Sequence, residues 1–183
     1  MLDEDGWVGR WAKLFHHFDK PVIAAINGVA AGAGMSRALA ADLRVGCEAS
    51  RFKTVFIERS LSPDSGMSYF LPRIIGYARA ADLIFTSRAV DAEEAFRLGL
   101  LDRLVKQEAL IEESVKLANE MTQWPPLAPR MSKRVLQHNF EAGLDAALRY
   151  ESVSIGFGRK AANDMKESML AFTEKRKPTY TET

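Results

Sequence analysis

One stretch, residues 20–42, constrains the fold of this chain more than any other. It contains a short apolar run, residues 22–26, which the turn residues Asn27 and Gly28 end. An apolar run bounded in this way is typical of a strand that is buried on both faces. Three glycines fall within seven residues, at positions 28, 32 and 34, and an alanine-rich helical segment begins at Met35. The stretch therefore predicts a strand that passes through a glycine-rich turn into a helix.

The glycines of this turn have two interpretations. Glycine lets another group come close to bare backbone N–H groups, and the first N–H groups of a helix have no partner inside it. The N–H groups around Ala33, between Gly32 and Gly34, are therefore candidates for holding an anion or a developing oxyanion. The alternative is that the glycines only permit tight packing where the strand turns into the helix. A dinucleotide site is not indicated, because the Gly-x-Gly-x-x-Gly spacing is absent.

The complete string adds a family resemblance. Residues 20–34 read Lys-Pro-Val-Ile-Ala-Ala-Ile-Asn-Gly-Val-Ala-Ala-Gly-Ala-Gly, and Ala-Asp-Leu-Arg follows at residues 41–44. This string resembles the enoyl-coenzyme A hydratase/isomerase (crotonase) family. The resemblance implies that the Ala33 N–H polarises the carbonyl of an acyl-coenzyme A thioester, with Gly32 and Gly34 lining the substrate site. It also implies an α/β fold of the ClpP/crotonase type, with a spiral core and a helical C-terminal region.

Composition is consistent with one such domain and argues against other classes of protein. Hydrophobic residues make up 47% of the chain, which is enough for a sizeable core, and the net charge of +1 gives no reason to expect nucleic acid. The single cysteine, Cys47, fits a reducing compartment. The chain starts with acidic residues instead of a signal peptide, and it has no apolar run of membrane-spanning length. We therefore expect a soluble cytoplasmic enzyme with no metal and no membrane partner.

The remaining pattern predicts strands first and helices later. A helix with aromatic residues at helical spacing is expected to run from an N-cap at Asp3 or Asp5 to about Phe18. Its aromatic face is expected either to pack in the core or to border an acyl pocket. Further strands are expected at residues 42–47, 51–54 and 100–105. Further helices are expected at residues 67–76, 77–85, 91–98, 107–121, 129–140, 144–155 and 161–174. The expected domains are a crotonase-like core over residues 1–120 and a helical oligomerisation region over residues 121–183, which the resemblance implies forms a homotrimer or homohexamer.

One part of the family pattern is not found. In the family, a block of strands precedes the Lys-Pro strand and ends in a loop, often Ala-Gly-x-Asp, that supplies the second oxyanion N–H. No such sequence stands before Lys20. We therefore expect the chain to be N-terminally shortened, with Met1 as a wrong start or the chain as a shortened paralogue. A catalytically silent acyl-coenzyme A binder, or a truncated remnant, is one alternative to an enzyme.

The second alternative is an enoyl-coenzyme A hydratase. In hydratases of the family, two glutamates activate and protonate water, and their positions here hold Ser36 and Phe56. A serine hydroxyl cannot take a proton from water without a base beside it, so hydration is not favoured. Ser36 and Phe56 are instead expected to line the substrate site. Glu58, two residues beyond Phe56, is expected to be a solvated surface charge.

Residues 61–73, Leu-Ser-Pro-Asp-Ser-Gly-Met-Ser-Tyr-Phe-Leu-Pro-Arg, resemble the isomerase branch of the family. The resemblance implies that Asp64 moves a proton between carbons of the acyl chain, with Gly66 lining the site. Removing a proton beside the thioester of a 3-enoyl substrate gives a dienolate, whose charge the backbone N–H groups would stabilise. One carboxylate can serve as base and then as acid, so the reaction needs no cofactor beyond the coenzyme A of the substrate. The alternative is that Asp64 only caps the following helix.

The C-terminal sequence also resembles the family. Residues 171–178 read Ala-Phe-Thr-Glu-Lys-Arg-Lys-Pro. The resemblance implies that Phe172 and Lys175 contact the nucleotide end of coenzyme A bound to a neighbouring subunit. The alternative is that the basic run at residues 175–177 is a solvated end of the chain.

Overall fold

The structure is a computed structural model that describes residues 6–181 and divides into two compact units. Unit 1 is formed by residues 6–18 and 22–117, and unit 2 by residues 19–21 and 118–181. The expected N-cap at Asp3 or Asp5 lies outside the described residues. Within residues 6–181, no helix is both long enough and apolar enough to cross a bilayer. A cytoplasmic location stays a prediction.

Two three-stranded sheets form the centre of unit 1. In the first, β1 (Ile23–Ile26), β3 (Leu43–Cys47) and β6 (Arg103–Val105) run parallel in the order β1-β3-β6. In the second, β2 (Val29–Ala31) lies parallel to β4 (Arg51–Lys53), and β5 (Val90–Asp91) completes the sheet antiparallel to β4. The predicted strands are confirmed. The sequence pattern missed β2 and β5, because strands of two or three residues are too short to show a periodicity.

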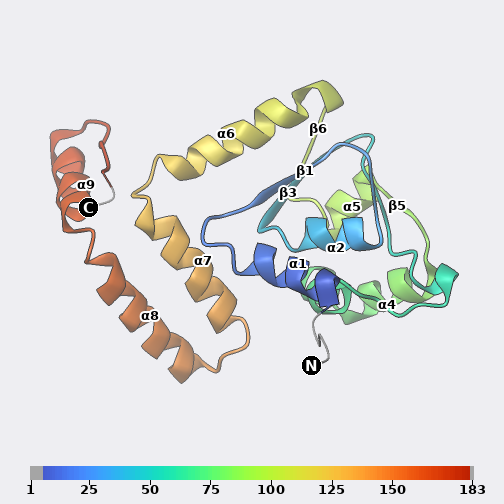
Figure 1. Cartoon of the computed structure of the whole chain (residues 1–183). Coiled ribbons are helices and arrows are strands. Elements are labelled where there is room, and N and C mark those ends of the chain that lie inside the picture. The colour runs from blue at the N-terminus through green and yellow to red at the C-terminus, as the bar shows by residue number, and fades with distance from the viewer. Residues whose placement is uncertain (1–5, 182–183) are drawn as a thin grey trace. The chain divides into compact units, whose positions relative to one another are not determined.

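In unit 1, α1 precedes the first strand and most of the other helices alternate with the strands (Figure 1). Helix α1 ends two residues before the predicted end, and α2 packs against both α1 and β2. Helix α2 begins two residues before the predicted start, because β2 shortens the glycine-rich turn. The helices are α1 (Gly6–His16), α2 (Ala33–Leu39), η1 (Ile57–Arg59), α3 (Met67–Ile75), α4 (Tyr77–Thr86), α5 (Ala92–Leu98), η2 (Gln107–Ala109) and α6 (Leu110–Thr122), of which α6 continues into unit 2.

Helix α5 shows how closely local sequence determines an element. The predicted start at residue 91 is confirmed: Asp91 is the N-cap, and its Oδ1 accepts a hydrogen bond of 2.8 Å from the Glu94 N–H. Gly99 ends the helix with φ 84°, a left-handed conformation that favours glycine. The Glu94 carboxylate binds the Arg88 guanidinium at 2.8 Å. The ends of α5 are therefore set by residues within a few positions of them.

Unit 2 contains α7 (Leu127–Asn139), α8 (Leu144–Gly158) and α9 (Ala162–Glu174), and α7 packs against α8. The His138 and Tyr150 rings stack between these two helices, with centroids 3.8 Å apart. Helix α7 was predicted to begin at Pro129. It begins at Leu127, so Pro129 is its third residue. Proline is tolerated there because the first N–H groups of a helix have no intrahelical partner.

The C-terminal tail of unit 2 folds back onto α9 through charged hydrogen bonds. The Glu167 carboxylate accepts bonds from Arg176 Nη1 at 2.5 Å, from Arg176 Nη2 at 2.8 Å and from the Thr179 N–H at 2.7 Å. The Thr181 N–H donates to Asp164 Oδ1 at 2.8 Å. The bonds from Arg176, followed by the bond from Thr179, lower the pKa of Glu167 to about 2.

We expect the fold-back of this tail to be lost in acid. Because the pKa of Glu167 is lower in the folded chain than its ordinary 4.5, its contribution is present above pH 4.5 and lost as the pH falls toward 2. NMR titration of the Thr179 amide and the Glu167 carboxyl should show a midpoint near pH 2. Glu167→Gln should remove the transition of the Thr179 amide. A Glu167 midpoint near 4.5 would contradict the expected contact.

Candidate active site

The start of α2 presents backbone donors at the predicted position. Gly32 caps the helix with φ 51° and ψ −124°, and its N–H donates to the Lys53 carbonyl of β4 at 3.0 Å. The first hydrogen bond within the helix runs from the Ser36 N–H to the Gly32 carbonyl at 2.9 Å. The N–H groups of Ala33, Gly34 and Met35 therefore have no partner inside α2. Pairing of β2 with β4 fixes the backbone from which these donors start.

The two glycines that flank Ala33 have different roles. A Cβ at Gly32 would lie 3.0 Å from Val55 Cγ2, in a backbone conformation that only glycine adopts without strain. A Cβ at Gly34 would meet no atom within 4 Å. The fold therefore requires glycine at position 32. The space beside Gly34 is open to a ligand.

We expect alanine substitutions at the two positions to affect stability differently. Gly32→Ala should lower the free energy of unfolding by about 1–3 kcal/mol, the cost of holding alanine in a sparsely populated backbone region. Gly34→Ala should leave it unchanged or raise it by less than about 1 kcal/mol, because alanine favours a helix over glycine. Urea unfolding of the two variants measures the difference. Equal losses would show that Gly34 is also fixed by packing.

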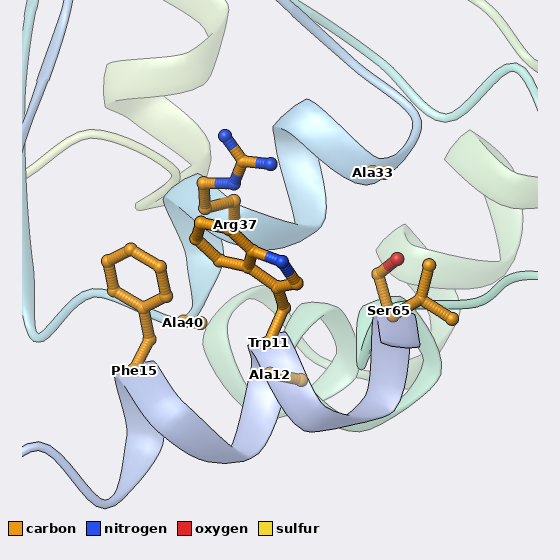
Figure 2. A pocket seen from close by; sticks show the side chains of 8 residues that line it. Trp11, Ala12, Phe15, Ala33, Arg37, Ala40 and Ser65 are labelled. Carbon is orange, nitrogen blue, oxygen red and sulfur yellow. The ribbon is translucent and has the colours of Figure 1, made fainter. Parts of the chain in front are cut away.

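A pocket adjoins Ala33 between α1 and α2. Its empty volume is about 290 Å³, much of which is space open to solvent. Figure 2 shows Trp11 and Phe15 of α1 opposite Arg37 of α2 and its C-cap residue Ala40, with Ser65 of the loop before α3 also at the pocket. The Trp11 and Phe15 rings stack with centroids 5.7 Å apart. The aromatic face of α1 therefore lines a pocket with Ala33, and the role of that pocket in binding an acyl group stays a prediction. The lining residues are Val8, Trp11, Ala12, Phe15, Ala33, Arg37, Ala40 and Ser65.

A second pocket lies along α1 and shares Ala12 with the first. Its empty volume is about 640 Å³. The Tyr69 and Phe70 rings of α3 line it and meet edge to face, with centroids 5.1 Å apart. Gly66 also lines it, and a Cβ there would lie 2.6 Å from Phe70 Cε2. Glycine at position 66 therefore makes room for the ring of Phe70.

Ser36 joins α2 to the loop that carries Asp64. Its side chain is 0% exposed, and its Oγ lies 3.3 Å from the Gly32 carbonyl oxygen and 3.2 Å from the Asp64 carbonyl oxygen. The hydroxyl donates to these backbone oxygens and holds the Asp64 loop against the start of α2. The sequence showed that position 36 lacks a carboxylate. It contained no signal for this contact, because the two residues are 28 positions apart.

The Asp64 side chain is exposed and is not a helix cap. Its Oδ1 accepts a hydrogen bond of 2.8 Å from Ser65 Oγ, and the backbone turns through Ser65 and Gly66 with φ values of 54° and 85°. Gly66, not Asp64, is the N-cap of α3, and no side chain bonds to the cap position. The capping interpretation of Asp64 is therefore wrong. The left-handed turn at Ser65 and Gly66 forms the start of α3, so the Asp64 carboxylate does not bond to the N–H groups of this helix.

Phe56 and Glu58 line neither of the two pockets. Phe56 is 5% exposed and packs in the hydrophobic core with residues such as Met35 and Phe52. Glu58 is a surface charge, as predicted, and its carboxylate pairs with Lys53 Nζ at 2.6 Å. Position 56 therefore contributes apolar packing and no acid or base.

The predicted coenzyme A contacts belong to unit 2. Phe172 is 87% exposed on α9, and Lys175 caps that helix in a left-handed conformation with φ 53°. Within the basic run 175–177, Arg176 is held by Glu167 and Glu174. Arg176 is thus a structural residue of the tail, whereas Phe172 and Lys175 extend outward.

Comparison with known proteins identifies the family. A model of the enoyl-CoA hydratase/isomerase family matches residues 7–183. The chain belongs to this family. It is 34% identical over 168 residues to the crotonyl-CoA hydratase of Syntrophomonas wolfei and 35% identical over 159 residues to the short-chain-enoyl-CoA hydratase of Clostridium acetobutylicum. These alignments cover 92% and 87% of this chain but 64% and 60% of the two relatives.

The fold of this family member agrees with solved structures. The enoyl-CoA hydratase of Bacillus anthracis matches with a TM-score of 0.91 and 31% identity, over 100% of this chain and 72% of that chain. The predicted crotonase-like α/β fold is confirmed. The curated relatives are named hydratases, so the predicted preference for isomerisation is not confirmed by the comparisons. Among residues 6–181, no group of three or more acidic, histidine or cysteine side chains is placed to hold a metal ion.

Proposed function

We propose that this family member acts on an acyl-coenzyme A thioester and shifts a carbon–carbon double bond by proton transfer. One observation carries the proposal. Ser36 and Phe56, at the positions where the resemblance puts the hydratase glutamates, are buried and have no carboxyl group. The Asp64 carboxylate is exposed, and its neighbour Ser65 lines the pocket that also contains Ala33. A single carboxylate beside the pocket that contains the Ala33 donor suits proton transfer better than addition of water.

The reaction begins with removal of a proton from C2 of a 3-enoyl thioester by the Asp64 carboxylate. The electrons of that C–H bond form the C1=C2 bond, and the charge of the resulting dienolate collects on the thioester oxygen. The Ala33 N–H donates to that oxygen and stabilises the charge. Asp64 then returns the proton to C4, the C3=C4 bond is lost, and the conjugated 2-enoyl thioester forms. Atoms and charge balance without a cofactor.

The residues around Ala33 and Asp64 hold these two groups in place. Ser36 fixes the backbone of Asp64 relative to the start of α2 through its hydroxyl. Gly34 leaves the approach to the N–H groups open, whereas Gly32 and Gly66 shape the backbone on either side. In this proposal Phe56 acts on the site only through the packing of the core.

Hydration is the second candidate, because the curated relatives carry hydratase names. Adding water across a 2-enoyl thioester requires a base for the water and an acid for C2. In hydration these functions serve two different molecules, the water and the thioester, whereas in isomerisation one carboxylate carries a single proton from C2 to C4. We therefore rank hydration below isomerisation for this chain.

We also propose that the chain assembles as a homotrimer or homohexamer through residues 121–183. Large apolar side chains are exposed along the helices of unit 2, including Leu136, Phe140, Leu144 and Met169. Exposed apolar area of this kind often marks a protein interface. Phe172 and Lys175 would then reach the coenzyme A of a neighbouring subunit. Sedimentation equilibrium of the chain tests the assembly.

Turnover of a 3-enoyl-coenzyme A by the purified chain tests the proposed function. We expect the conjugated 2-enoyl product, which is detected by its ultraviolet absorbance. We expect no 3-hydroxyacyl product in mass spectrometry. Formation of the 3-hydroxyacyl product from a 2-enoyl thioester would favour hydration instead. Saturable binding of the thioester without either product would favour a silent acyl-coenzyme A binder.

A further inference from the structure

Among the residues that line the pocket beside Ala33, one is cationic, Arg37, and the others are apolar except for Ser65. Arg37 is on α2, four residues after Ala33, so both residues face the same side of the helix. Its Cζ atom lies 4.5 Å from the centroid of the Trp11 ring (Figure 2). Trp11 comes from α1, so the two helices together hold the charge at the pocket.

Stacking on Trp11 occupies the face of the guanidinium and leaves its edges available. A guanidinium carries five N–H donors, and all of them lie in its plane. A ring stacked on the face stabilises the cation without using these donors. Among residues 6–181, no carboxylate lies within ion-pair distance of Arg37. The arrangement therefore holds an arginine in one place with its edges ready for a planar anion.

We propose that the acyl group bound by this chain carries a carboxylate, and that Arg37 binds it. This inference rests on the proposed function, because it takes the thioester carbonyl to lie at the Ala33 N–H. A carboxylate is planar and accepts two parallel hydrogen bonds from a guanidinium edge. Arg37 is therefore a residue that determines specificity for the acyl group.

The position of Arg37 favours a carboxylate on the acyl group over a phosphate of coenzyme A. The backbone positions of Ala33 and Arg37 are separated by about 6 Å along the helix axis, at about 1.5 Å per residue, and both residues line the same pocket. The acyl chain starts at the carbonyl carbon, so a short chain with a terminal carboxylate spans this interval. The phosphates are separated from the thioester by the full length of the pantetheine arm.

Binding of two saturated thioesters that differ only at the end of the chain tests this inference. Calorimetry compares hexanoyl-coenzyme A with adipyl-coenzyme A, which has the same carbon chain and a terminal carboxylate. Neither compound can be isomerised, so the result does not depend on turnover. We expect adipyl-coenzyme A to bind about tenfold to hundredfold more tightly, the size expected for charge-assisted hydrogen bonds.

Three variants separate the role of Arg37 from general effects. Arg37→Met should abolish the preference for the adipyl thioester and leave hexanoyl binding within about twofold. Arg37→Lys should keep part of the preference, since the charge remains but the planar fork is lost. Arg79→Met, at an exposed arginine of α4 that lines neither pocket, is the control and should keep all of it.

Three outcomes would overturn the inference. Equal binding of the two thioesters to the unsubstituted chain would show that no carboxylate is recognised. Equal weakening of both thioesters and of free coenzyme A by Arg37→Met would place a phosphate at Arg37 instead. Absence of binding of either thioester would overturn this inference together with the proposed acyl-coenzyme A site. Turnover of a neutral 3-enoyl thioester decides the proposed function separately.

Discussion

Asp64→Asn is expected to lower kcat for isomerisation by about a hundredfold to ten-thousandfold, the usual contribution of a general acid–base group. Asparagine has nearly the same shape and can still accept a hydrogen bond from Ser65 Oγ, so the turn before α3 should persist. It cannot take a proton from C2 of the substrate. KM for the 3-enoyl thioester should change little, because in the proposed mechanism the thioester oxygen binds the Ala33 N–H and not the carboxylate.

Glu58→Gln is the matched control for this substitution. Glu58 is also an exposed carboxylate of unit 1, but it pairs with Lys53, and neither of its chain neighbours lines a pocket, whereas Ser65 beside Asp64 does. Loss of an exposed ion pair changes stability little, so the variant should stay folded. Its kcat should change by less than about twofold, because Glu58 has no role in the proposed proton transfer. Full activity of Asp64→Asn, or equal losses in both variants, would show that Asp64 does not transfer the proton. Steady-state kinetics of the purified variants distinguishes these results.

Phe52→Ala should have the largest effect on stability, lowering the free energy of unfolding by about 3–5 kcal/mol. Phe52 is 0% exposed, and it lies on β4 in the hydrophobic core of unit 1. Alanine would leave a cavity that the surrounding side chains fill only in part. Because β4 pairs with β2 just before Ala33, we also expect weaker thioester binding. Urea unfolding followed by tryptophan fluorescence and circular dichroism measures the loss.

Phe85→Ala makes the same chemical change at an exposed position. Phe85 is 69% exposed at the end of α4, so its removal should change the free energy of unfolding by less than about 0.5 kcal/mol. A loss as large as that of Phe52→Ala would show that Phe85 is covered in the assembled protein. A small loss for Phe52→Ala would mean that the core of unit 1 is repacked or less tight than its burial indicates.

Several features of the site were predictable because they depend on neighbours in the chain. The apolar run before Asn27 predicted β1, and the Asp91 cap with Gly99 predicted both ends of α5. These elements depend on backbone preferences and capping bonds within a few residues. The lack of a carboxyl group at positions 36 and 56 could likewise be read directly from the sequence.

Other features depend on contacts that a local pattern does not contain. The pairing of β2 with β4 moved the start of α2 to Ala33, and the turn at Ser65 and Gly66 excluded Asp64 as the cap of α3. The predicted start of α7 was wrong because a proline fits any position in the first turn. In each case, the local sequence was compatible with more than one structure. Contacts outside the local pattern decided which one forms.

The sequence by itself determined the family, most of the helices and strands, and which side chains can exchange a proton. Periodicity, capping and residue chemistry act over a few positions and are visible in a string of letters. Only the tertiary structure decided that Ser36 holds the backbone of Asp64 and that Trp11 lies under Arg37 beside Ala33. Trp11 and Asp64 are far in the chain from the α2 residues that they contact, and the packing of α1 and the Asp64 loop against α2 brings them together.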